Sequence, residues 1–327
     1  MHRLFPEVRA VRWKVLWRLW LPLAGIGLFL WCPEATRTGV REGLALCGST
    51  LIPALFPVSV LAGCLIRTHP PGKAGKLSAG AMGALFGLPG EAALPLLLGL
   101  LGGFPLGAQL TATAYESGHL SKQHAARLAG LSNNAGPAFL LGAVGTMLNA
   151  PAAGAALLFI QLVSVLLCGL LLREKTHCRK INKKSEKKQP PSPGAVLPLC
   201  IGESAAAMLR LAGAGALFQA VLACLKALFP LTGLPLLWQA GLSGALELTG
   251  GLALLRGSAS PALLPLAAAM IGWGGLCVHL QAAQALARVG LPMGPYLRCK
   301  ALQAVAALLL SLCLICVQKI TGILPFL

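Results

Sequence analysis

Long apolar runs extend along almost the whole chain, and they constrain its fold more than any other feature. Nine apolar segments can be marked, at residues 15–32, 43–66, 79–108, 125–148, 150–172, 196–226, 234–255, 262–287 and 301–325. A helix of about 20 apolar residues crosses the hydrocarbon core of a bilayer. A helix also satisfies its own backbone hydrogen bonds, which hydrocarbon cannot do. We therefore expect an all-α polytopic membrane protein.

The composition supports a membrane protein and leaves no room for a separate soluble domain. Of the 327 residues, 56% are hydrophobic and only 11% are charged. A typical soluble domain carries roughly 25% charged residues. The net charge of +18 is concentrated in two basic blocks, residues 2–18 and 173–188. Each block flanks an apolar segment, which the positive-inside rule predicts for cytoplasmic ends, so we expect no nucleic-acid partner.

The two basic blocks divide the chain into expected regions. Residues 1–40 are expected to form a basic N-terminus and an uncleaved signal-anchor helix, because no small-x-small cleavage site cleanly follows the apolar core that ends at Cys32. Residues 173–195 are expected to form a solvated cytoplasmic linker. Anionic lipid is an additional expected partner of its basic part, residues 173–188.

Two stretches combine polar side chains with helix breakers inside or beside apolar runs. One spans residues 102–109 and the other residues 132–137. The expected hinges are glycines and prolines, namely Gly103, Pro105, Gly107, Gly136 and Pro137. Such breaks are tolerated at membrane depth only where protein buries them or where they line a cavity. Paired broken segments are typical of transporter binding sites.

The second half of the chain repeats this organisation. The pairs are residues 43–66 with 196–226, 102–109 with 244–251, 132–137 with 272–275 (which holds the hinges Gly274 and Gly275), and 150–172 with 301–325. We therefore expect two membrane repeats, residues 41–172 and 196–327.

Charge bias also constrains the topology of these repeats. If both basic blocks are cytoplasmic, an even number of crossings separates them, although five apolar segments lie between. One of the two broken segments, 79–108 or 125–148, should then be re-entrant. Each repeat would cross the membrane three times, which makes the two repeats inverted with respect to each other.

Polar residues at the breaks and within apolar segments are the candidate substrate-binding residues. They are Gln109, Ser132, Asn133, Asn134, Arg210, Glu247, Thr249, His279 and Gln281. The asparagine amides suit a carboxylate or a ring nitrogen. Alternatively, they satisfy backbone groups that Gly136 and Pro137 release.

The charged candidates leave similar alternatives open. Glu247 lies deep in an apolar segment, where a carboxylate is costly, and it is a candidate coupling-proton site or an ion-pair partner of Arg210. Arg210 suits a substrate carboxylate, and Glu203, seven residues earlier on the same helical face, is another partner for it. His279 is either a packing residue or a proton relay.

Enzyme and metal motifs are not found in the sequence. Ser132 does not lie in a nucleophile elbow, and no His, Asp or Glu cluster has metal-ligand spacing, so neither enzymatic activity, a metal nor a cofactor is expected. The eleven cysteines are scattered through apolar segments and are interpreted as small hydrophobic residues.

Several motifs together resemble the YlbJ family of sporulation integral membrane proteins. They are Pro53–Pro57 (PALFP), Gly103–Ala108 (GFPLGA), Ser132–Pro137 (SNNAGP), Gly244–Glu247 (GALE) and Gly275–Gln281 (GLCVHLQ). The resemblance implies two nucleoside-recognition (Gate) domains. It also implies passage of dipicolinic acid across the outer forespore membrane during endospore formation.

From the residues and this resemblance, we expect a transporter or facilitator of a small organic anion, most specifically dipicolinic acid, in a multi-pass cell membrane. Two alternatives remain open: a non-transporting membrane scaffold for assembly of the spore envelope or cortex, and a nucleoside transporter.

Overall fold

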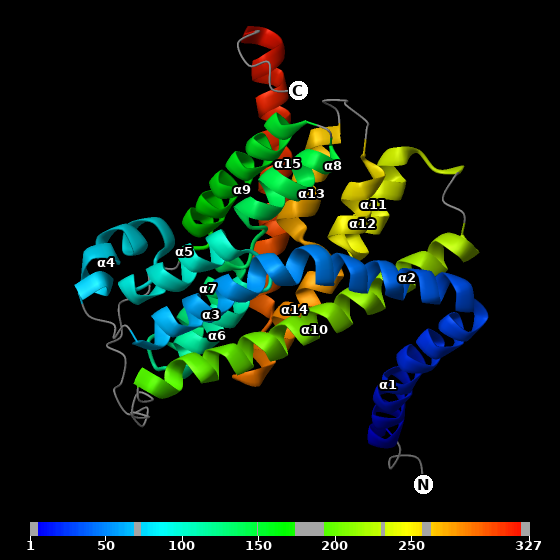
Figure 1. Ribbon diagram of the computed structural model, residues 1–327, viewed down its shortest axis with the longest axis horizontal. Helices are drawn as coiled ribbons and strands as arrows, with labels where there is room; N and C mark the ends of the chain where they lie inside the picture. Colours follow the sequence, from blue (N-terminus) through cyan, green and yellow to red (C-terminus); the bar gives the residue numbers. More distant parts are fainter. Residues whose placement is uncertain are drawn as a thin grey trace.

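The expected all-α class is confirmed by the computed structural model, which describes residues 6–68, 73–148, 150–173, 193–229, 233–256 and 263–321 (Figure 1). Within these ranges the regular structure is entirely helical. Four helical segments are long and apolar enough to cross a membrane, or six if each of two bent helix pairs forms one span. The protein is therefore a polytopic membrane protein.

The helices before the basic linker form the first part of the fold. They are α1 (Pro6–Trp31), α2 (Pro33–Leu46), the π-helix η1 (Cys47–Leu51), α3 (Ile52–Thr68), α4 (Lys73–Phe86), the 3-10 helix η2 (Gly90–Ala92), α5 (Ala93–Gly102), α6 (Leu106–Glu116), α7 (Lys122–Ser132), the π-helix η3 (Ala138–Val144), α8 (Gly145–Met147) and α9 (Pro151–Leu171).

The helices after the linker form the second part. They are α10 (Pro193–Leu228), α11 (Leu236–Leu246), α12 (Leu248–Leu254), α13 (Leu264–Trp273), α14 (Gly275–Arg288) and α15 (Gly294–Thr321). Most of the linker, residues 174–192, lies outside the described residues. A long helix, two interrupted segments and a closing helix follow one another here, as they do in the first part, which contains α1, α4 and η2 in addition.

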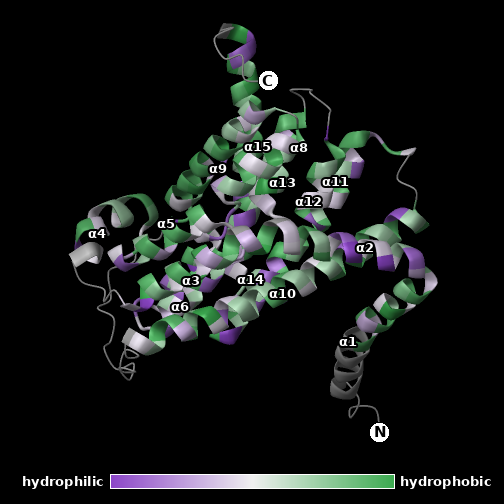
Figure 2. Ribbon diagram, in the orientation of Figure 1, coloured by the Kyte–Doolittle hydropathy of each residue, from purple (hydrophilic) through white to green (hydrophobic). Residues whose placement is uncertain are grey.

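The long helix α10 packs along α2 and α3, and these helices cross the molecule together (Figure 1). The helix expected as a signal anchor is α1, which ends at Trp31 and is bent by 103° from the following helix. Figure 2 shows apolar residues over most of the helical surface. Exposed leucines are costly in water, so these surfaces are suited to contact with lipid.

Two interrupted segments fold back on themselves as helical hairpins. In the first, α5 ends at Gly102 and α6 begins at Leu106, with a left-handed Gly103 (φ +81°) between them. The two arms touch closely, since a Cβ built on Gly99 would lie 2.8 Å from the Cα of Gly107. The hairpin lies partly within segment 79–108, one of the two segments expected to be re-entrant.

The second part of the chain contains a corresponding hairpin formed by α11 and α12. A Cβ built on Gly251 would lie 2.8 Å from the carbonyl oxygen of Ala240, so these arms also pack against each other. In contrast, α13 and α14 are interrupted at Gly274 (φ +91°), but together they form one candidate span. Both parts of the chain thus contain a helical hairpin followed by an interrupted helix.

The close approach at Gly107 generates a stability prediction. A Cβ built on Gly107 would contact backbone atoms of Ser132, and it would lie 2.7 Å from the Cα of Asn133. Overpacking typically costs about 1–3 kcal/mol, so Gly107→Ala should lower the thermal unfolding midpoint of the detergent-purified protein by several degrees.

The matched control is Gly213→Ala in α10, where an added Cβ meets nothing within 4 Å. Because alanine is favoured over glycine inside a helix by about 1 kcal/mol, this variant should be as stable as the parent or more stable. Equal stability of the two variants would contradict the close packing of the hairpin.

Candidate functional site

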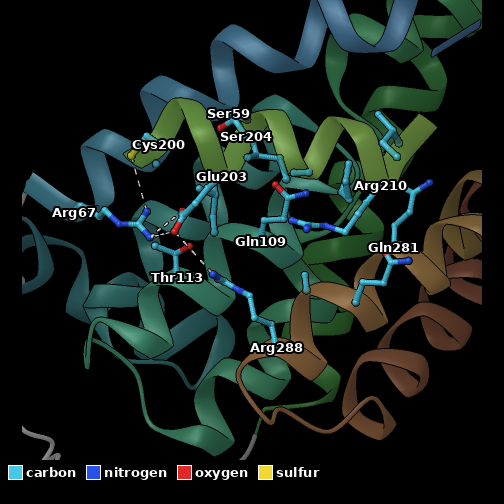
Figure 3. A pocket seen from close by; sticks show the side chains of 18 residues that line it. Ser59, Arg67, Gln109, Thr113, Cys200, Glu203, Ser204, Arg210, Gln281 and Arg288 are labelled. Carbon is cyan, nitrogen blue, oxygen red and sulfur yellow. Dashed lines mark hydrogen bonds and ion pairs between the residues drawn. The ribbon is translucent and has the colours of Figure 1, made fainter. Parts of the chain in front are cut away.

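A polar cavity of about 230 Å³ lies between α3, α6, α10 and α14 (Figure 3). Its polar and charged lining comes from both parts of the chain: Ser59, Arg67, Gln109, Thr113, Cys200, Glu203, Ser204, Arg210, Gln281, Gln284 and Arg288. We call it the arginine cavity. It begins just beyond two helix breaks, because α6 follows the break at Gly103 and α14 follows the break at Gly274.

Positive charge exceeds negative charge in the arginine cavity. Three arginines line it, against Glu203 as its one carboxylate among the described residues. Nη2 of Arg67 lies 2.9 Å from a carboxylate oxygen of Glu203, and Nη1 of Arg288 lies 4.0 Å from the other side of the same group. Arg288 also lies 3.5 Å from Glu116 at the end of α6. These ion pairs tie α3, α6, α10 and α14 together.

Arg210 differs from the other two arginines. It lines the same cavity beside Gln109 and Gln281 (Figure 3), but among the described residues no carboxylate lies within ion-pair distance of it. The expected alternatives of a pair with Glu247 or Glu203 are therefore not found here. A guanidinium with two neighbouring amides presents several donors in one place, which suits a carboxylate ligand.

A second, larger cavity of about 560 Å³ lies where the interrupted helices meet. Its walls include residues at or near each break: Gly103, Phe104, Gly136, Glu247, Thr249, Cys277 and Val278. We call it the break cavity. Most of its lining is apolar, with Gln219, Glu247, Thr249, Thr146, Arg256 and Gln281 as polar exceptions.

The two cavities share two wall residues, Leu211 of α10 and Gln281 of α14. The side chain of Gln281 is buried, and its Nε2 donates to the sulfur of Cys277 over 3.4 Å. Its Oε1 has no hydrogen-bond partner among the described residues. Because an unsatisfied buried carbonyl is costly, this atom is a candidate acceptor for a ligand or water.

Glu247 caps the break between α11 and α12. Its carboxylate accepts hydrogen bonds from the backbone N–H of Thr249 (3.1 Å) and of Gly250 (2.6 Å). The Thr249 hydroxyl (2.6 Å) and Nε2 of Gln219 (2.7 Å) donate to it as well. A carboxylate at a helix N-terminus is stabilised by the helix dipole. The immediate role of Glu247 is thus to hold the second hairpin together.

Asn133 and His279 belong to a buried network that joins the two parts of the chain. Oδ1 of Asn133 accepts from the backbone N–H of Ala108 (3.4 Å), and its Nδ2 donates to the hydroxyl of Tyr296 (3.2 Å). The same hydroxyl lies 3.1 Å from Nδ1 of His279, whose ring packs edge-on against Trp273. Nε2 of His279 has no partner among the described residues.

Asn134 holds a buried lysine. Its Oδ1 accepts from Nζ of Lys300 (2.8 Å) and from Nε2 of Gln303 (2.7 Å), and its Nδ2 donates to the carbonyl of Leu131 (2.6 Å). Lys300 is completely buried, donates also to Oε1 of Gln303 (2.8 Å), and lies 5.7 Å from the ring centre of Phe104. The ring contributes cation–π attraction to the ammonium.

The structure therefore divides the predicted site residues into three groups. Gln109, Arg210 and Gln281 line the arginine cavity, and Glu247, Thr249 and again Gln281 line the break cavity. The third group is Ser132, Asn133, Asn134 and His279, which are buried in the protein interior and line neither cavity. The hydroxyl of Ser132 lies 3.0 Å from that of Thr111 and donates to the carbonyl of Gly107.

Three basic residues of these arrangements were missed by sequence reasoning. They are Arg67, Arg288 and Lys300. Each lies at the edge of an apolar segment, where a basic residue is ordinarily interpreted as exposed to solvent. They are distinguished by lying within a helix that continues past the edge of the apolar segment. Lys300 lies six residues inside α15, and Arg67 and Arg288 occupy the last turns of α3 and α14.

The fold and the cavities thus define an all-α multi-pass membrane protein with a cation-rich interior. Over 112 residues, 34% of this chain, the sequence is 32% identical to the sporulation integral membrane protein YlbJ of Bacillus subtilis (strain 168). The matched region covers 28% of that relative's length. No protein-family model and no solved structure matches the chain. The likeness points to a sporulation integral membrane protein.

The contacts of Asn134 generate a second prediction. Asn134→Leu removes an acceptor from the buried ammonium of Lys300, and a hydrogen bond to a charged group contributes about 1.5–3 kcal/mol. The variant should therefore lose much of its thermal stability or its membrane abundance. The double variant Asn134→Leu with Lys300→Met removes the buried charge too and should recover at least half of the loss.

The double-mutant cycle separates a bracing role from a ligand-contact role. If Asn134 served only to contact a ligand, Asn134→Leu would unfold at the same temperature as the parent, and the second substitution would restore nothing. Thermal unfolding of all four proteins in one detergent, without ligand, is the measurement.

Proposed function

We propose that this protein carries a small organic anion across a membrane of the sporulating cell, with dipicolinic acid as the substrate. The observation that carries the proposal is the arginine cavity, in which three arginines from α3, α10 and α14 face one carboxylate. Arg210 is exposed in this cavity and has no carboxylate within ion-pair distance among the described residues, so the cavity is suited to a negatively charged occupant.

Dipicolinate is a planar pyridine ring with two carboxylates, and the cavity contains matching donors. The guanidinium of Arg210 binds a carboxylate with two parallel N–H donors. Gln109 lines the same cavity and offers an amide N–H group to the second carboxylate or the ring nitrogen. The volume of about 230 Å³ is below the roughly 300–1,000 Å³ typical of drug-sized ligands, which favours a small molecule.

The two cavities support a route through the protein. They are separated at Leu211 and Gln281, and the surrounding helices are interrupted or folded back. In transporters, such discontinuous helices rearrange around a central site to expose it alternately to the two sides. In this proposal, the substrate passes between the cavities beside Gln281, while Asn133, Asn134 and Glu247 brace the breaks.

The relative in Bacillus subtilis supports the sporulation context, since it is described as a sporulation integral membrane protein. A transporter of dipicolinate would act in the outer forespore membrane, and we place this protein there as part of the proposal. The cationic lining of the arginine cavity favours transport of an anion over transport of an uncharged nucleoside.

The direct test is uptake of labelled dipicolinate by lipid vesicles that contain the purified protein. Arg210→Gln removes the bidentate donor, so its uptake should fall by about tenfold or more at equal protein content, which corresponds to roughly 1.4 kcal/mol. The matched control is Arg37→Gln, because Arg37 is exposed, pairs with Glu34 on α2 and lines neither cavity. The control variant should transport at the rate of the parent.

Competition identifies the substrate class in the same vesicles. Unlabelled dipicolinate and other small dicarboxylates should inhibit uptake, and nucleosides should not. Stronger inhibition by nucleosides would overturn the anion assignment. Vesicles that show no saturable uptake of any of these compounds would instead favour the membrane-scaffold alternative.

A further inference from the structure

A third cavity, of about 410 Å³, lies away from the two already described. It is formed by the start of α7, the end of α9 and the start of α15. Three cations line it, Lys122, Arg127 and Arg298, together with Leu131, Leu172 and Pro295. Among the residues that the structure describes, no Asp or Glu belongs to its lining.

The three cations have different surroundings. Arg127 is buried and donates to the backbone carbonyls of Phe86 (2.8 Å), Gly87 (3.3 Å) and Leu172 (2.8 Å), so it joins α4 and α9 to α7. Lys122 and Arg298 are exposed, and neither forms an ion pair among the described residues. The two exposed cations, Lys122 and Arg298, together with the buried Arg127 offer a site for a polyvalent oxyanion.

Apolar surface leads away from this cavity along both neighbouring long helices. The end of α9 and the start of α15 are adjacent, since the thiol of Cys168 lies 3.9 Å from the carbonyl oxygen of Cys299. On α15, exposed residues follow Arg298 at helical spacing: Val305, Leu309 and Leu312. On α9, the exposed apolar residues are Leu170, Leu166, Leu162 and Phe159.

This arrangement has the chemistry of a phospholipid: a charged end followed by about 20 Å of apolar surface along helices that rise roughly 1.5 Å per residue. We propose that the third cavity binds the headgroup of an anionic phospholipid, whose acyl chains lie along the exposed rows of α9 and α15. The site goes beyond the proposed transport function and does not depend on it.

The position in the sequence supports a lipid of the cytoplasmic leaflet. Arg173 directly follows the lining residue Leu172, and it begins the basic block for which the positive-inside rule predicts a cytoplasmic location. That leaflet supplies anionic headgroups, which attract cations near its surface. A free phosphate ion would fill the cationic part but would make no use of the apolar rows.

The test uses the full-length protein, purified in an uncharged detergent, and its thermal unfolding midpoint. Short-chain phosphatidylglycerol should raise the midpoint by a few degrees, because a ligand that binds only the folded state stabilises it. Phosphatidylcholine of the same chain length, inorganic phosphate and glycerol 3-phosphate should each raise it by less than half as much. Equal shifts with phosphatidylcholine, or with inorganic phosphate, would overturn the anionic-lipid assignment.

Substitutions of the lining cations test whether the lipid binds in the third cavity. The double variant Lys122→Gln with Arg298→Gln should need at least about tenfold more phosphatidylglycerol for half of the shift. The matched control is Arg37→Gln with Lys226→Gln, which removes two exposed cations elsewhere and should behave as the parent. A charge-preserving pair, Lys122→Arg with Arg298→Lys, should retain most of the shift. A full shift in the double variant would overturn the proposal.

Discussion

Backbone groups at the helix breaks need partners from the protein, because hydrocarbon offers them none. At three of the breaks a polar side chain is such a partner. Asn133 accepts from the backbone of Ala108 beyond the first break, and Glu247 caps α12 beyond the third. The amide of Gln161 donates to the carbonyl of Ala135 over 2.7 Å inside the second. The rest of the architecture depends on these contacts, since without them the hairpins and interrupted helices would expose unpaired N–H and C=O groups to lipid.

Because the breaks need such partners, the polar residues of the interior have two different roles. Side chains next to a break are already engaged by backbone or by each other, as the contacts of Asn134 with Leu131, Lys300 and Gln303 illustrate. Residues one helical turn or more beyond a break, such as Gln109 and Gln281, are not needed as caps and reach the cavities. A small set of broken helices can thus hold its own backbone and still present polar groups to a ligand.

The fold class and the positions of the breaks could be predicted from sequence because both depend on local composition. Apolar length predicts helices, and glycine with proline predicts where they stop, as at Gly103 and Gly274. The distribution of side chains between cavity and interior could not be predicted, because it depends on which helices pack together. Lys300 illustrates the difference. Its position beside an apolar segment predicts exposure to solvent, but it lies within α15 and donates to Asn134 in the interior.

The interior charge also bears on the kind of ligand that such a fold accepts. Four cations, Arg67, Arg210, Arg288 and Lys300, outnumber the three carboxylates that lie near them, Glu116, Glu203 and Glu247. Glu247 is held as a cap and Glu203 is shared by two arginines, so neither neutralises Arg210. Arg210 is exposed, and its guanidinium can pair with an anionic ligand but not with an uncharged one. The charge of the cavity lining therefore favours anionic ligands.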